Sequence, residues 1–283
     1  MNQVFDFKRW LLLVGKHWSE NSKKYTLSLA GMLALMVIWY SFVLLLEPRN
    51  PYPEEMQVAT YYIGMAIAGC LYASLFFADL SSGPRAMHFL SVPASHFEKL
   101  LTGLFYAVIL FFVCYTLIFY LVDFIMISIA NGIESSSEAR RQAGLIYEKR
   151  MFAVNVFTQP LGYNHGGTPL YLYFLVIYFN VQSAFLLGSV YFPSYSFIKT
   201  CIVLLLLFLF GVFLIGTVLN GLLPDGWFHQ GLFSYAIYEE GATEVRGVRL
   251  PDWVGVVSKY LAMYGFLPIF WTATYFRLKE KEV

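Results

Sequence analysis

The sequence predicts an all-α integral membrane protein with six transmembrane helices, and three observations support this fold class. The chain has 283 residues, of which 58% are hydrophobic and 13% charged, whereas soluble domains carry about 25% charged residues. Long uncharged runs recur along the whole chain, and helices of roughly 20 residues cross a bilayer core. The polar stretches between them are too short to enclose a core. We therefore expect an amphipathic helix over 1–24 and one transmembrane domain over 25–283.

Six apolar runs define the expected spans. Five reach the length that a bilayer requires, and the last is extended by Trp253–Ser258 beyond the single charge of Lys259. Six crossings place both termini on one side of the membrane. The runs are Tyr25–Leu46, Met56–Ala78, Leu100–Val122, Gly166–Ile198, Thr200–Pro224 and Tyr260–Phe276.

Basic residues around the first span predict its orientation. Several precede the span, and Arg49 alone follows shortly after it. Because basic residues favour the cytoplasmic side, both termini are expected in the cytoplasm. The connector 79–99 then lies inside, and segments 131–167 and 220–252 lie outside. The basic residues before the first span are Lys8, Arg9, Lys16, Lys23 and Lys24.

The N-terminal segment 1–24 has apolar residues at helical spacing, interleaved with basic ones. This pattern predicts an amphipathic helix in the interface of the inner leaflet, in contact with membrane lipid. Phe7, Trp10 and Trp18 are its expected anchors. The alternative is an ordinary basic flank to the first span.

The inner connector 79–99 alternates helix breakers with a short helical stretch. Gly83-Pro84 is expected to end the second span, and Pro93 to end a short helix that begins at Arg85. Ser95-x-x-Glu98 then forms a capping box at the start of the third span. Such organisation exceeds what a passive connector needs.

The outer segment 220–252 is rich in glycine, proline and aromatic residues. We expect short helices or re-entrant pieces at the outer interface. Glu244–Arg249 is a candidate for a small hairpin.

Few ionisable residues lie at membrane depth, where they are expensive and often functional. Asp123 is the clearest candidate, expected near the outer end of the third span, either at the water interface or lining a substrate path. Tyr178, Asn180 and Gln182 place polar tips within the fourth span, where they line the same path or bond neighbouring helices.

Other chemistry finds little support in the sequence. The five histidines lack metal-ligand spacing, and the three cysteines lie in apolar runs as expected of buried hydrophobes. No Walker loop or GxSxG motif occurs, so we expect no enzyme and no cofactor in this chain. A net charge of +1 gives no reason to expect a nucleic-acid partner.

The whole pattern resembles the permease subunit of ABC-2 type transporters. Pro93-Ala94-Ser95 and Glu98-Lys99 match the family's inner connector, whereas Ser82-Gly83-Pro84-Arg85 replaces its usual Glu-Arg and Gly-Thr, as in a divergent member. The resemblance implies a separate ABC ATPase subunit carrying ATP and Mg²⁺, and a homodimer of permeases. It also implies ATPase docking through the connector and the N-terminal helix. The docking residues would be Arg85, His88, Phe89, Leu90 and Glu98.

The expected function is transport across a bacterial inner (cytoplasmic) membrane, with export of a hydrophobic or lipid-linked substrate. The second hypothesis is a non-transporting scaffold subunit of an envelope secretion or motility complex. A lipid-directed enzyme is the weakest hypothesis, since Asp123 would be its sole foothold.

Overall fold

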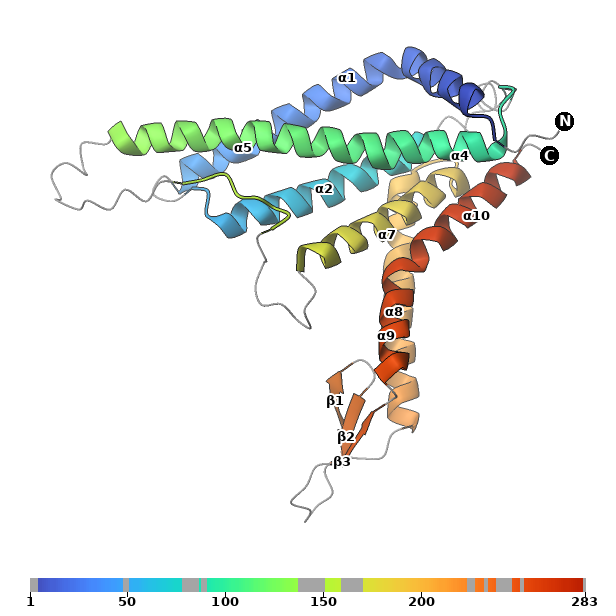
Figure 1. Ribbon diagram of the computed structural model, residues 1–283. Helices are drawn as coiled ribbons and strands as arrows, with labels where there is room; N and C mark the ends of the chain where they lie inside the picture. Colours follow the sequence, from blue (N-terminus) through green and yellow to red (C-terminus); the bar gives the residue numbers. More distant parts are fainter. Residues whose placement is uncertain are drawn as a thin grey trace, which may run out of the picture.

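A computed structural model describes most of the chain and is predominantly helical (Figure 1). The described part contains five helices that are long and apolar enough to cross a membrane. These candidate spans are Phe7–Leu46, Glu54–Phe76, His96–Ile133, Tyr171–Tyr191 and Ser196–Leu214. The described residues are 5–47, 51–77, 87, 91–136, 151–158, 170–222, 227–231, 234–237, 246–249 and 252–281.

Helix α1 covers Phe7–Leu46 and joins the predicted amphipathic helix to the first span without interruption. Its N-cap is Asp6, whose side chain accepts hydrogen bonds from the amides of Lys8 and Arg9. A helix of 40 residues is about 60 Å long at 1.5 Å per residue, about twice a bilayer core. Figure 1 shows that its first part bends away from the remainder, so both predicted parts exist within one bent helix.

Helix α2, Glu54–Phe76, begins after Pro53 and has two glutamates in its first turn. Negative charges are stabilised there by the positive end of the helix dipole. It packs against α7, Leu170–Tyr191, and against the third helix. One apolar cluster lies near the end of α1 and the start of α2, and it includes Tyr40, Tyr61 and Phe119. A second cluster lies near the end of α2 and includes Ala73, Phe77 and Leu100.

The third span consists of three consecutive helical segments. They are α4, His96–Leu104; a π-helical turn, η2, Phe105–Leu110; and α5, Phe111–Ser136. The predicted capping box is confirmed, because Ser95 and Glu98 exchange side-chain to backbone hydrogen bonds at the start of α4. The helix continues well past the expected end at 122. Asp123 is therefore in its interior and not at its outer end.

Helix α7 is followed by a tight turn and by α8, Ser196–Leu222. Tyr195 in this turn has a φ of 53°, in the left-handed region. Figure 1 shows α8 at a steep angle to α2, α5 and α7. Most apolar side chains between 202 and 214 are exposed on every side of α8.

Three short strands follow α8 and lie near its far end (Figure 1). They are β1, Trp227–Gly231; β2, Ser234–Ile237; and β3, Arg246–Arg249. They form an antiparallel sheet in the order β1-β2-β3. The all-α class therefore holds for the spans alone. Short helices were the wrong expectation for these three stretches, and β3 pairs with β2 instead of forming a separate hairpin.

The last predicted span is divided into α9, Asp252–Tyr264, and α10, Phe266–Glu280. Each piece is too short to count among the five candidate spans. The break has a local cause: Pro268 has no amide hydrogen to offer the carbonyl of Tyr264. A Cβ on Gly265 would also collide with the backbone oxygen of Leu261. Figure 1 places the start of α1, the start of α4 and the end of α10 at the same end of the molecule.

Candidate functional site

The first candidate site joins the start of α1 to the start of α4, and we call it the Glu98 clamp: Asp6, Arg9, Ser95 and Glu98. The Glu98 side chain is fully buried. Arg9 donates to it from Nε at 2.8 and 3.0 Å and from Nη2 at 2.7 Å. The amides of Asp6 and Ser95 donate to the same carboxylate at 2.8 and 2.9 Å.

The clamp compensates the burial of a charge. A carboxylate removed from water requires a cationic partner and hydrogen bonds to both oxygens, and Glu98 has these from two helices. The clamp therefore fixes the N-terminal helix to the first turn of the third span.

Aromatic packing extends this junction. Trp10 meets Phe105 edge-on, with ring centroids 6.0 Å apart, and Phe5 meets Phe97 in the same manner at 6.0 Å. The hydroxyl of Tyr106 donates to the backbone oxygen of Val14 at 2.9 Å. The α1–α4 contact is thus held by apolar surface as well as charge.

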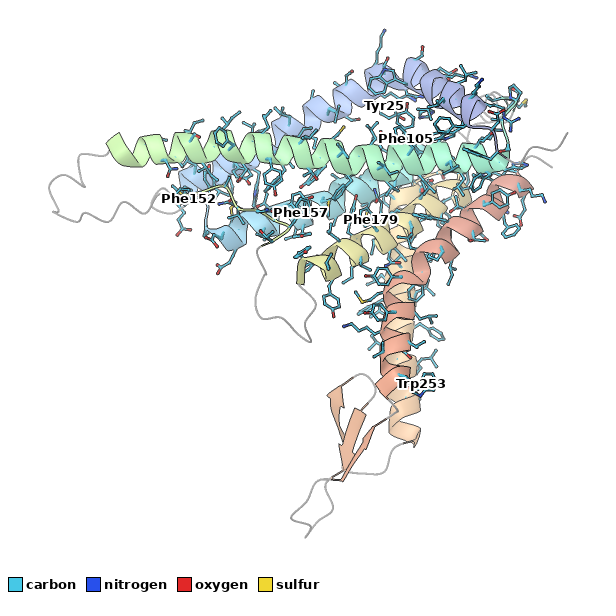
Figure 2. All side chains as sticks on the ribbon, in the orientation of Figure 1. Tyr25, Phe105, Phe152, Phe157, Phe179 and Trp253 are labelled. Carbon is cyan, nitrogen blue, oxygen red and sulfur yellow. The ribbon has the colours of Figure 1, made fainter. Side chains whose placement is uncertain are left out.

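A second layer of this junction lies further along α1. His17 packs on Phe76 of α2 and on Tyr106 of η2, and Tyr25 stacks on Tyr106 at 5.3 Å. Figure 2 shows Tyr25 and Phe105 where α1 lies over the start of the third helix. The N-terminal part of α1 is consequently joined to both the second and the third spans.

Of the three predicted membrane anchors, Phe7 and Trp18 are exposed, as lipid contact requires. Trp10 instead faces protein, against Phe105. The predicted docking residues Arg85, His88, Phe89 and Leu90 lie outside the described residues, whereas Glu98 lies at the centre of the clamp. Glu98 was predicted both as a helix cap and as a docking residue, whereas no local pattern identified Arg9 as its partner.

Asp123 of α5 belongs to a second site, near the C-terminal end of α1. Its side chain is fully buried, and its Oδ1 accepts a hydrogen bond from the hydroxyl of Tyr40 in α1 at 2.9 Å. Tyr52 covers this pair and donates to the backbone oxygen of Tyr40 at 2.8 Å. Asp123 is therefore enclosed by protein, and its side chain has no exposed surface.

A short outer strip, residues 151–158, packs beside this site. Gln57 of α2 donates to the carbonyl of Phe152 at 3.2 Å and accepts from the amide of Val154 at 3.0 Å. Asn131 pairs with the backbone of Met151 in the same two-sided way. Figure 2 shows Phe152 and Phe157 of the strip beside α2 and α5.

Two of the three polar residues of α7, Asn180 and Gln182, bond neighbouring helices. Gln182 donates to the carbonyl of Ala107 in η2 at 2.6 Å, and Asn180 donates to that of Met263 in α9 at 2.6 Å. Tyr178 is buried where its hydroxyl meets Gly69 of α2. The structure does not bring Asn180 or Gln182 to Asp123, and these contacts favour helix–helix bonding over a shared path.

The sequence offered no signal for two features of these sites. The π-helical turn η2 carries the carbonyl that Gln182 satisfies, and Tyr40 supplies the partner of Asp123 from 83 residues away. Among the residues described, no group of three or more His, Cys, Asp or Glu is arranged to hold a metal ion.

Comparisons with known protein families, with curated proteins and with solved structures find no match for this chain. A functional interpretation therefore has to be based on the contacts of the Glu98 clamp and of the buried polar groups.

Proposed function

We propose that the chain is the membrane-spanning subunit of an ABC-type transporter in a bacterial inner membrane, powered by a separate ATPase. The observation that carries the proposal is the Glu98 clamp. It joins the two elements to which the ABC-2 resemblance assigns ATPase contact: the N-terminal helix and the end of the connector 79–99. ATP and Mg²⁺ belong to the partner subunit, and this chain itself performs no chemistry.

In this proposal, movement of the ATPase is transmitted through the connector to Ser95 and Glu98. Because Arg9 and the amide of Asp6 bond the same carboxylate, α1 and α4 move together. The packing of His17 on Phe76 extends the movement to α2. A single input at the inner face would thus reorient three helices at once.

Six spans with cytoplasmic termini remain part of the proposal. Together α9 and α10 cover Asp252–Glu280, which at 1.5 Å per residue is about 43 Å and sufficient to cross a bilayer. Asn180 bonds the carbonyl of Met263 beside the break, which supports a broken but continuous crossing.

A homodimer is also part of the proposal, and α8 supports it. A helix that is apolar on every side is typical of a site enclosed by lipid or by other helices, and α8 runs at a steep angle to α2, α5 and α7 (Figure 1). A second copy would cover part of this surface. The substrate would be a hydrophobic or lipid-linked molecule that enters between the copies.

The test is purification from native membranes in a mild detergent. The wild-type chain should recover an ATP-hydrolysing subunit, and the triple variant Arg85→Ala, His88→Ala, Phe89→Ala should lose it. Arg277→Ala with Glu280→Ala is the matched control, because these residues form an ion pair near the end of α10, outside both proposed docking elements. Absence of any ATPase from the wild-type sample would contradict the proposal.

The scaffold hypothesis remains the second candidate, and the outer strip favours it. Residues 151–158 are fastened by Gln57, Asn131 and Tyr62, so the chain presents an ordered outer surface suited to a periplasmic partner. Crosslinks from Phe152, which is exposed, to an envelope protein in a sample without ATPase would support this hypothesis.

A further inference from the structure

Asp123 has a setting that the transport proposal does not use. Its carboxyl group is fully buried in the interior of α5, and Tyr40, which bonds it, lies six residues before the end of α1. Six residues correspond to about 9 Å along a helix. The carboxyl group is thus below the outer surface and is separated from it by Tyr52.

Among the described residues, the side chains that face this carboxyl are tyrosines. Tyr40 approaches from α1, Tyr52 from the outer connector, and Tyr120 from α5 itself. Within the described ranges, Oδ2 of Asp123 has no hydrogen-bond partner, and no Lys, Arg or His of those ranges forms a salt bridge with it. Glu98, which is equally buried, has both a cation and several donors.

This contrast determines how the two acids can ionise. A buried carboxylate without a cation is costly, whereas the neutral acid is tolerated. An ionised Asp123 would need donors for Oδ2, and the described structure supplies these only by admitting water after α1 or Tyr52 moves.

We propose that Asp123 is a proton-binding site, which exchanges a proton with water on the outer side and whose occupancy controls the contact between α1 and α5. With the proton bound, the acid is neutral and the Tyr40–Asp123 pair stays enclosed. When the proton is transferred to water, water molecules enter to hydrogen-bond the carboxylate. The outer end of α1 then separates from α5. The proposal stands independently of an ATPase partner.

The first test is isotope-edited infrared spectroscopy of the purified full chain, with ¹³C-labelled aspartate, titrated from about pH 5 to about pH 9. A carbonyl band of a protonated acid should be present at the acidic end and lost toward the alkaline end. Asp123→Asn should remove this band, whereas the same substitution at Asp252 should leave it.

The second test measures the distance between spin labels at positions 45 and 133, both exposed in the structure, in a chain whose three cysteines are replaced. The distance should increase with pH in the wild type and remain constant in Asp123→Asn. Should Asp123→Asn fail to fold, the infrared and distance titrations of the wild type are sufficient to test the proposal. A protonated-acid band that is missing at every pH, or that persists unchanged throughout, would overturn the proposal, as would a constant distance in the wild type.

Discussion

The guanidinium of Arg9 and the carboxylate of Glu98 are 89 residues apart in the chain. Their contact joins the start of α1 to the start of α4. Glu98 also caps α4 through Ser95. The Glu98 side chain thus caps the N-terminus of α4 and also bonds α1. Its loss should therefore destabilise both helices.

The first prediction is a double-mutant cycle on this pair. Glu98→Gln removes the charge that Arg9 and two amides stabilise, and should lower the melting temperature in detergent by several degrees. Arg9→Gln should give a smaller loss, because Arg9 is partly exposed. The two effects should be non-additive, since both remove the same contact.

The control for this cycle is Lys16→Gln with Glu20→Gln, an exposed i,i+4 pair on the same helix. Such pairs contribute little to stability, so the melting temperature should barely change. Additive losses for Arg9 and Glu98 would show that the contact is absent in the folded chain.

The second prediction concerns the cap of α4. Ser95→Ala removes the oxygen that accepts from the amide of Glu98 at 3.2 Å, and should destabilise the chain by about 1 kcal/mol. Ser95→Asp should retain most of the stability because aspartate caps equally well. Thermal unfolding of both variants, beside Ser194→Ala in the α7–α8 turn, measures the difference.

The third prediction tests close packing between α2 and α5. A Cβ at Gly64 would lie 2.5 Å from the hydroxyl oxygen of Tyr115, and the next atom of that ring is 3.6 Å away. Gly64→Ala should therefore destabilise by about 1–3 kcal/mol through overpacking. Adding Tyr115→Phe removes the colliding atom and should recover most of the loss. An equally unstable double variant would contradict the packing described.

The fourth prediction concerns Gln182 and the π-helical turn. Gln182→Leu leaves the buried carbonyl of Ala107 without the donor it has at 2.6 Å, a loss of about 1–3 kcal/mol. Val181→Leu is the control, because the neighbouring Val181 is exposed. Hydrogen exchange at residues 105–110 should accelerate in Gln182→Leu and remain unchanged in the control.

Local patterns in the sequence predicted much of the helical framework. The capping box at Ser95 and Glu98 needs only neighbouring residues, and its position was confirmed. Five long apolar helices likewise follow from composition alone. The third helix extends past Val122 because Ser128 and Asn131 bond the helix backbone or the segment at Met151. Asp123 is held through Oδ1 by Tyr40, so the polar residues there did not end the helix.

Contacts between distant segments could not be predicted. Arg9 looked like one of several basic residues on an amphipathic surface, and nothing near Asp123 in sequence identified Tyr40. The sheet of β1, β2 and β3 depends on pairing between strands, which glycine and aromatic content do not specify. The apolar composition of the last predicted span continues through Gly265, so composition does not predict the break there. Pro268 does indicate a break, because proline removes a helical hydrogen bond.

The break at Gly265 has a consequence for measurements on the last crossing. A probe on α10 and a probe near Trp253 in α9 lie on two separate helices. Since Pro268 cannot bond the carbonyl of Tyr264 between them, a label on one helix does not report the orientation of the other, and each helix needs a label of its own.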